Sequence, residues 1–414
     1  MTDAARALDP YPANLPERTN EQWQQLHDRC LTPNYGARRL ALVRGEGSWV
    51  WDAEGKRYLD FLTGISVCNL GHCHPRITEA IRRQSETLVH CSNLYYIPIQ
   101  IELARLLVDH CFADRVFFGN SGAEANEAAI KMARRWNREH HGAGRHEIIS
   151  MENSFHGRTL ATLTATGQTK VKQYFDPLVE GFRFVPFNDL RALRDAVTDS
   201  TGAILLEPIQ GEGGIIPADP DYLRGVRQLC NERGILLIFD EVQCGLGRAG
   251  TLFAYEHYGV APDIMTLAKS LGGGLAMGAM LCTDRLAKAF GPGAHASTMG
   301  GNAITSAAAL AYVKELIEGG WPARGAEMGS YMMMSLVQAT ESSALVGELR
   351  GQGMMIGLDL VDHAPEVLVD CERNGLLINV TGGRTLRFLP PLNATREQID
   401  QAVEIVAGAI RVRG

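Results

Sequence analysis

The sequence lacks any run of 18 apolar residues, so it offers no candidate for a membrane-spanning helix. Its first twenty residues also lack the apolar centre of a signal peptide. We therefore expect a cytoplasmic protein that does not bind membranes. The excess of charge is small, with 40 Lys and Arg against 47 Asp and Glu and a net charge of −7. Without a basic patch, nucleic acid is not an expected partner.

Cysteines in paired spacing are also absent. The nine cysteines are scattered and odd in number, which favours a reducing compartment over a disulfide framework. Residues 71–75 (GHCHP) have histidines on both sides of a cysteine, but zinc sites need ligands about two to four residues apart and a second cluster. We expect no metal here and interpret the segment as a turn before a helix over residues 76–88. His140, His141 and His146 are assigned to a loop.

The length of 414 residues allows more than one core, because single cores stop growing at about 250–300 residues. From residue 100 onward, helical and strand-like segments alternate, which is typical of an α/β fold with a mostly parallel central sheet and helices on both faces. A helix over residues 303–317 then leads into a smaller α+β unit. We expect an N-terminal arm and hairpin segment (1–75) that packs with the small domain, a large ligand-binding domain (76–304) and a C-terminal small domain (305–414).

Two charged residues stand at the ends of apolar runs. Residues 235–239 (ILLIF) form a continuous apolar run that predicts a strand buried on both faces, and Asp240 follows it directly. Residues 263–268 (DIMTLA) end on Lys269. Ligands bind at the carboxyl edge of such sheets, and a desolvated lysine can become a neutral amine that forms imines with carbonyls. An acid for a pyridinium nitrogen and an imine-forming lysine together favour pyridoxal phosphate chemistry.

Three further segments also follow predicted strands. Residues 119–127 (GNSGAEANE) open a helix, where free backbone N–H groups and the helix dipole attract anions. Residues 154–159 (SFHGRT) offer an aromatic cover for a flat ring and an arginine for a carboxylate. Residues 207–214 (EPIQGEGG) contribute glutamates that could pair with a cation. The glycine-containing turn at residues 119–127 matches neither a P-loop nor a GxGxxG pattern, which argues against the alternative of a nicotinamide-dependent oxidoreductase.

Taken together, the motifs resemble the class III aminotransferases of fold type I, over nearly the whole chain and in the same order. The motifs that carry the resemblance are NSGAE at 120–124, FHGR at 155–158, EPIQGE at 207–212, DEVQ at 240–243, Lys269 and STMGGN at 297–302. The resemblance implies a pyridoxal phosphate enzyme that forms a homodimer with shared active sites and uses 2-oxoglutarate as amino acceptor. The fold it implies is the fold type I transferase, with a large cofactor domain and a smaller α+β domain.

The resemblance also implies roles for individual residues. Lys269 would bind the cofactor aldehyde as an imine and then transfer a proton, while Asp240 would hold the pyridinium N–H. Arg158 would bind the substrate α-carboxylate. Arg387, in LRFLPP at 386–391, would bind the α-carboxylate of glutamate or 2-oxoglutarate and would pair with Glu212 when the other substrate is bound. The remaining cofactor contacts are Ser121, Gly122, Ala123, Phe155, Glu241, Val242, Gln243 and, from the neighbouring subunit, Thr298, with Ser297 near the substrate.

Within that class, the segments VRGEGS at 43–48 and FADRVFF at 112–118 resemble those of enzymes that act on N2-acetylornithine, so the resemblance implies N2-acetylornithine as the donor. Ornithine, 4-aminobutyrate, succinylornithine and N-succinyldiaminopimelate stay open as alternative donors. Ile65 stands where ornithine aminotransferases carry a tyrosine, which argues against free ornithine. Ala303 departs from a common Asn-Pro sequence without touching a catalytic role. A non-catalytic protein of the same fold is a further alternative, against which an intact Lys269 and Asp240 argue.

Overall fold

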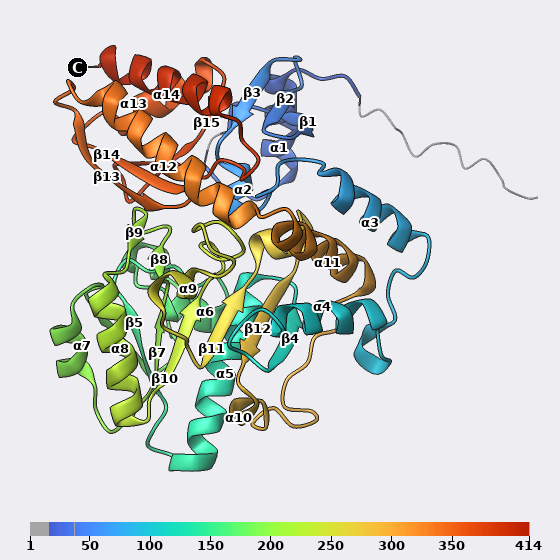
Figure 1. Ribbon diagram of the computed structural model, residues 1–414, viewed down its shortest axis with the longest axis vertical. Helices are drawn as coiled ribbons and strands as arrows, with labels where there is room; N and C mark the ends of the chain where they lie inside the picture. Colours follow the sequence, from blue (N-terminus) through green and yellow to red (C-terminus); the bar gives the residue numbers. More distant parts are fainter. Residues whose placement is uncertain (1–15, 37, 414) are drawn as a thin grey trace, which may run out of the picture.

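The computed structural model describes residues 16–36 and 38–413 (Figure 1). Its centre is a seven-stranded sheet in the order β4-β12-β11-β10-β7-β5-β6. The strands from β11 to β6 run parallel, whereas β12 is antiparallel to both of its neighbours. This confirms the mostly parallel sheet. The strands are β4 (Arg115–Gly119), β5 (Glu147–Met151), β6 (Phe182–Val185), β7 (Thr201–Leu206), β10 (Leu236–Asp240), β11 (Ile264–Leu267) and β12 (Gly278–Cys282).

Helices cover both faces of this sheet, as its apolar strands require. Along β10, Leu236 and Ile238 pack in the core that contains α5, while Leu237 and Phe239 pack in the core that contains α8. Side chains alternate between the two faces of a strand, so β10 is apolar on both sides. The helices between the strands are α5 (Gly122–His141), α6 (Leu160–Ala165), α7 (Leu190–Ala196), α8 (Pro220–Arg233), α9 (Ala254–Tyr258) and α10 (Asp284–Ala287).

The end of α5 corrects one expectation. His140 and His141 lie in the last turn of this helix rather than in a loop, whereas His146 does precede β5 outside any helix. The His140 ring stacks on Trp136 with centroids 4.5 Å apart, and its Nδ1 lies 2.8 Å from the Trp136 carbonyl. Basic side chains suit the negative end of the helix dipole, which explains why the helix continues through them.

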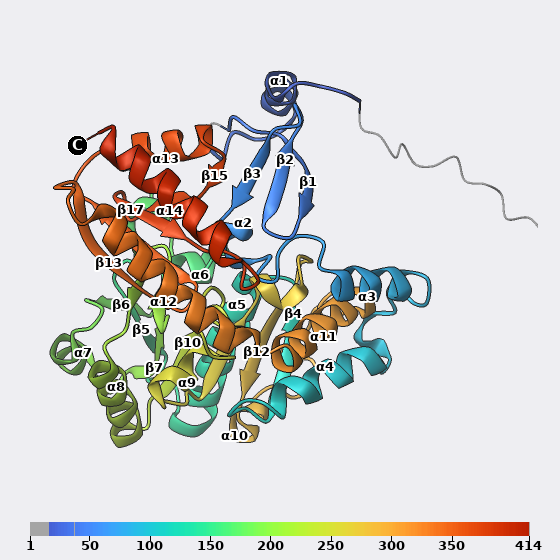
Figure 2. The ribbon, with the colours of Figure 1, turned by 45° about the horizontal axis from the view of Figure 1, so that its top comes forward.

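The N-terminal segment packs with the C-terminal one. Helix α1 (Asn20–Cys30) begins at a capping box formed by Thr19 and Gln22. Strands β1 (Leu42–Glu46), β2 (Trp49–Asp52) and β3 (Arg57–Asp60) form the predicted antiparallel meander. Strand β15 (Leu376–Leu377) then adds to β3 in parallel, and both ribbon views show the blue meander beside the red C-terminal segment (Figures 1 and 2). The first half of the predicted arm, residues 1–15, lies outside the described residues.

The C-terminal part contains a second sheet in the order β13-β14-β17-β16. Sequence reasoning did not locate the helix α12 (Trp321–Thr340) within the predicted α+β unit. The proposed boundary at residue 305 falls within α11, which packs against α3 and α4.

In the described ranges, no helix has the length and apolar character needed to cross a membrane. The remaining elements are α2 (Thr63–Ser66), α3 (Pro75–Ser85), α4 (Pro98–Val108), α11 (Ala303–Glu318), α12 (Trp321–Thr340), α13 (Ala364–Arg373), α14 (Arg396–Arg411), β8 (Ile209–Gln210), β9 (Ile216–Pro217), β13 (Val346–Gln352), β14 (Met355–Leu360), β16 (Asn379–Thr381), β17 (Thr385–Phe388) and the short 3₁₀ turns η1 (Ser92–Leu94), η2 (Thr169–Lys172) and η3 (Lys269–Gly272).

Candidate active site

A pocket of about 550 Å³ lies where β10 and β11 end, at the carboxyl edge of the central sheet. This is the edge at which open α/β sheets bind ligands. The pocket brings together residues that are far apart in the chain. The predicted residues that line it are Ser121, Gly122, Ala123, Phe155, Arg158, Asp240, Val242, Gln243 and Lys269.

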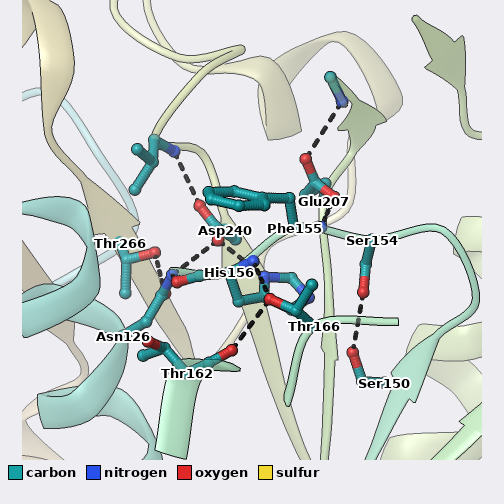
Figure 3. A network of polar contacts seen from close by, with 12 residues as sticks. Asn126, Ser150, Ser154, Phe155, His156, Thr162, Thr166, Glu207, Asp240 and Thr266 are labelled. Atoms are coloured by element: carbon teal, nitrogen blue, oxygen red, sulfur yellow. Dashed lines mark hydrogen bonds and ion pairs between the residues drawn. The ribbon is translucent and has the colours of Figure 1, made fainter. Parts of the chain in front are cut away.

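Asp240 is held at the floor of this site. It is the last residue of β10 and shares the face of Leu236 and Ile238, which is directed toward α5. Its Oδ2 accepts hydrogen bonds from Asn126 Nδ2 at 2.7 Å and from His156 Nδ1 at 2.8 Å (Figure 3). With a carboxylate as partner, His156 carries its proton on Nδ1. Two side chains from different elements thus fix one oxygen of a residue that is 3% exposed.

The other oxygen of Asp240, Oδ1, can accept one more hydrogen bond. Oδ1 accepts the backbone N–H of Val242 at 3.0 Å, and a carboxylate oxygen can take a second donor. Asn126 is itself fixed, because its amide oxygen accepts the hydroxyl of Thr266 at 2.7 Å. A buried carboxylate needs cationic or hydrogen-bonding partners to stay ionised. The arrangement therefore fits a charged donor from a ligand on the pocket side.

Lys269 follows β11 at the opposite wall of the pocket. Burial lowers the pKa of its amine from 10.5 to about 8, further lowered by Arg387 and opposed by Glu212, Asp240 and Glu207. This amine therefore loses its proton more readily than an ordinary lysine, and the neutral form is the one that nucleophilic chemistry requires. Its backbone has φ 47°, a left-handed conformation that is uncommon for residues other than glycine. Such strain is found at functional sites, where the surrounding structure enforces it.

The start of α5 forms the third wall. Ser121 caps the helix, and its hydroxyl accepts the N–H of Glu124 at 3.1 Å. The next residue is Gly122, where a Cβ would lie 2.8 Å from the Val242 side chain. Only glycine therefore fits between helix and pocket wall. The N–H groups of the first turn lie at the positive end of a 20-residue helix, a setting suited to a phosphate.

Phe155 and Arg158 line the outer side. The backbone N–H of Phe155 donates to Glu207 Oε2 at 3.0 Å, and the Gly211 N–H donates to Oε1 at 3.1 Å. Burial raises the pKa of Glu207 to about 7, opposed by His156. The guanidinium of Arg158 lies 5.2 Å from the centre of the Phe155 ring and is exposed to solvent. An exposed arginine beside an aromatic wall can receive a carboxylate.

Glu212 and Arg387 meet next to the pocket. Arg387 Nη1 donates to Glu212 Oε1 at 2.5 Å and to Gln243 Oε1 at 3.1 Å. Burial alone would raise the pKa of Glu212, but the charge and hydrogen bond of Arg387 outweigh burial, so the pKa lies below its usual value. The predicted pair is thus in contact. Gln243, which was expected to contact the cofactor, lines the pocket and also accepts the hydrogen bond from Arg387.

Glu241 corrects a second expectation. Its carboxylate accepts the backbone N–H groups of Ala254 at 2.6 Å and Tyr255 at 2.7 Å, so it caps α9 away from the pocket. Successive residues of a strand point to opposite sides, so the side chain of Glu241 points away from that of Asp240 and from the pocket. Ser297 and Thr298 do not line the pocket of their own chain. Ser297 Oγ lies 3.2 Å from the pocket residue Asn120, and Thr298 is exposed.

Sequence reasoning missed the residues that support Asp240. Asn126, His156 and Thr266 were inside or beside the quoted motifs, but none was given this role. The only available signal was positional. Asn126 is a polar residue on a face of α5 that is otherwise rich in alanine, and such a residue is buried only with a hydrogen-bond partner.

Comparison with known proteins adds independent information. A family model described as "Aminotransferase class-III" matches residues 31–410. The chain is a class III aminotransferase. It is 50% identical over 379 residues to an acetylornithine aminotransferase of Caldanaerobacter subterraneus subsp. tengcongensis, covering 91% of this chain and 96% of that protein. It is also 50% identical to the acetylornithine aminotransferase of Methanocaldococcus jannaschii, over 93% of this chain and 97% of that protein.

A solved structure of ornithine aminotransferase from Toxoplasma gondii, described with partial occupancy of PLP at its active site, matches this aminotransferase with a TM-score of 0.93. The two share 31% identity, with 96% of this chain and 95% of that chain covered. The likeness confirms the predicted fold type I architecture. The oxidoreductase alternative is thereby replaced by a pyridoxal phosphate-dependent transaminase.

The described residues fit this cofactor. Asp240 has a free acceptor position for a pyridinium N–H, and Lys269 is a buried amine with a lowered pKa. The absence of a Cβ at Gly122 leaves room at the start of α5, where a phosphate is favoured. The aminotransferase thus has an acid, an amine and an anion site around one pocket.

Proposed function

We propose that this aminotransferase transfers the δ-amino group of N2-acetylornithine to 2-oxoglutarate, giving N-acetyl-L-glutamate 5-semialdehyde and glutamate. In arginine biosynthesis the reaction would run in the opposite direction. The observation that carries the proposal is the 50% identity to acetylornithine aminotransferases over nine-tenths of the chain. Ornithine, 4-aminobutyrate, succinylornithine and N-succinyldiaminopimelate are the alternative donors.

When bound, pyridoxal phosphate supplies an aldehyde that accepts the amino group and a ring that delocalises electrons. In our proposal, Asp240 keeps a proton on the ring nitrogen, and Lys269 provides the neutral amine that takes and returns the proton at the amino-bearing carbon. The first turn of α5, with Ser121, Gly122 and Ala123, holds the phosphate. Phe155 and Val242 enclose the ring and exclude water from its faces.

Two arginines divide the work of substrate binding. Arg158 is exposed at the pocket mouth and binds the α-carboxylate of the donor. Arg387 is fully buried and binds the α-carboxylate of glutamate or 2-oxoglutarate once Glu212 gives up its contact. The 2.5 Å contact between Glu212 and Arg387 supports this role. While the amino donor is bound, Glu212 occupies the guanidinium of Arg387. When glutamate or 2-oxoglutarate binds, its α-carboxylate takes the place of Glu212.

A homodimer with shared active sites completes the proposal, with Thr298 reaching the phosphate of the neighbouring subunit. Large apolar side chains are exposed beside the segment that carries Thr298: Leu94 is 81% exposed, Tyr95 72% and Tyr96 92%. The two segments are joined by Asn93, whose side chain donates to the Ser297 carbonyl at 2.9 Å. Exposed apolar patches of this kind mark interfaces between proteins.

A donor panel tests the substrate. The purified enzyme, loaded with pyridoxal phosphate, is assayed with 2-oxoglutarate and each of the five donors. We expect kcat/KM for N2-acetylornithine to exceed the next donor by about tenfold, the discrimination that a pocket contact typically gives. A higher value for ornithine or 4-aminobutyrate would refute the donor. An enzyme that binds the cofactor, with its visible absorbance, but converts no donor would favour the non-catalytic alternative.

A further inference from the structure

The surroundings of Arg387 contain an asymmetry of charge. The guanidinium is completely buried, and three side chains accept its hydrogen bonds. Nε donates to Asn379 Oδ1 at 2.9 Å, while Nη1 donates to Glu212 and Gln243. Two of these acceptors are neutral amides. Within residues 16–36 and 38–413, Glu212 is the one carboxylate in ion-pair contact with this arginine.

The position of Asn379 is fixed by the sheet. Asn379 on β16 pairs directly with Arg387 on β17, so the two side chains are cross-strand neighbours on one face. Thr381 lies two residues along β16 on the same face, and its hydroxyl donates to the backbone carbonyl of Glu212 at 2.6 Å. One strand thus orients the arginine through Asn379 and supports the backbone of its acidic partner through Thr381.

We infer that Asn379 is a specificity-determining residue: it orients Arg387 without neutralising it, so that the Glu212 carboxylate is the exchangeable counter-charge. The inference rests on the proposed role of Arg387 in binding 2-oxoglutarate. A buried guanidinium that loses its carboxylate is strongly destabilised unless another anion replaces it. Glu212, whose side chain is 29% exposed, can leave toward solvent when a substrate carboxylate arrives. The site therefore selects substrates that bring a carboxylate to this position.

An acidic residue in place of Asn379 would remove this selection. An aspartate there would hold a permanent ion pair in the sheet, and an incoming carboxylate would meet a neutralised arginine and a second negative charge. An amide keeps the same hydrogen bond to Nε but adds no charge, so the Glu212 carboxylate remains the counter-charge of the guanidinium. The identity of the residue as an amide, rather than its size alone, is what the inference requires.

The experiment compares Asn379→Asp and Asn379→Ser in the enzyme loaded with pyridoxal phosphate. Asn374→Asp, at an exposed helix end of the same C-terminal part, is the matched control for the charge change. The probe is glutarate, an unreactive dicarboxylate, with its Kd measured by calorimetry. We expect Asn379→Asp to weaken glutarate binding by about thirtyfold, as close charge pairs at binding sites do. The serine variant should weaken glutarate binding by no more than about tenfold, because it loses one hydrogen bond to a charged group but adds no negative charge.

Kinetics give a second readout. The KM for 2-oxoglutarate should rise with the glutarate Kd in Asn379→Asp, while the KM for the amino donor should stay unchanged. Equal losses for the aspartate and serine variants would overturn the inference, because shape rather than charge would then decide. A parent enzyme that fails to bind glutarate or use 2-oxoglutarate would instead overturn the proposed function. These two failures are distinguishable in one set of titrations.

A charge-balanced pair keeps the test valid if Asn379→Asp is unstable. Glu212→Gln leaves Arg387 without its carboxylate and should bind glutarate more tightly than the parent. The double variant Asn379→Asp with Glu212→Gln restores one carboxylate next to the arginine, so it should regain thermal stability and bind glutarate weakly. If the double variant binds glutarate as tightly as Glu212→Gln, the inference is wrong.

Discussion

The active site contains two buried charge centres that are built in different ways. Asp240 is 3% exposed and receives hydrogen bonds from Asn126, His156 and the Val242 backbone. Glu212 has a side chain that is 29% exposed, and among the described residues its direct ion-pair contact is with Arg387. One carboxylate is fixed from several elements, whereas the other depends on one ion pair at the edge of solvent.

The difference matches the roles that we propose for the two carboxylates. A charge that serves the cofactor in every turnover is best held without freedom, because preorganised groups need no rearrangement during the reaction. A charge that must give way to a substrate has to have an alternative position in solvent. Lys269 lies between the two, since Glu212 and Asp240 both raise the pKa of its amine while Arg387 lowers it.

Removing the fixed charge should have the largest effect. Asp240→Asn keeps the shape but loses the charge that stabilises a protonated ring nitrogen, and it leaves His156 Nδ1 without a carboxylate. We expect kcat/KM to fall by about a thousandfold or more with both substrates, in line with the loss of a major electrostatic contribution. Steady-state assays with the donor and with 2-oxoglutarate measure the two losses separately.

The control for Asp240→Asn is Glu212→Gln, which removes the other charge in the same way. It should change the ratio of kcat/KM values between donor and 2-oxoglutarate, whereas Asp240→Asn should leave that ratio constant. A changed ratio in Asp240→Asn, or an activity close to the parent, would contradict the division between a fixed and an exchangeable charge.

The positions of Asp240 and Lys269 at the pocket could be predicted because each follows an apolar run. A buried strand has no reason to finish on Asp240, nor β11 to lead into Lys269, unless the sheet edge binds something charged. The contact of Glu212 with Arg387 was also predictable, although only through resemblance to the family. No periodicity in the sequence connects residues that are 175 positions apart.

Other parts could not be predicted, for physical reasons. Glu241 was assigned to the cofactor because it adjoins Asp240, yet neighbouring residues at a strand end point in opposite directions. Asn126 carried only a positional signal, which could not name its partner, because Asp240 lies 114 residues away in the chain. Helix α12 was overlooked because it contains glycines, which usually weaken helices. Gly329 lies inside it because a Cβ there would collide with the backbone of Gly353.

Loosening the fixed charge should have an intermediate effect. Asn126→Leu removes the amide that donates to Asp240 Oδ2 and accepts from Thr266. We expect kcat/KM to fall by about tenfold with both substrates and cofactor affinity to weaken, because one hydrogen bond to a charged group is lost. Thr266→Val, which removes only the outer hydrogen bond, is the control and should cost less. Equal losses of kcat/KM in the two variants would show that packing around α5, rather than the hydrogen bond to Asp240, causes the loss.

The smallest effect concerns the amine between the two charges. The pKa of Lys269 is about 8 in the folded protein, against 10.5 as its usual value. Below pH 8 both states bind the proton, and the buried ammonium destabilises the folded state by about 3 kcal/mol at most. Between pH 8 and 10.5 the unfolded chain binds a proton that the folded chain lacks, so stability rises with pH.

Lys269→Met removes this dependence and keeps the length of the side chain. Without cofactor, the variant should have a higher Tm than the parent at pH 7, and the difference should narrow steadily toward pH 10. Thermal unfolding at several pH values measures both, with Lys288→Met, a change at an exposed lysine, as the reference. A difference that stays constant with pH would mean that the Lys269 amine is not destabilised by its surroundings. Burial would then not be the cause that lowers the pKa of Lys269.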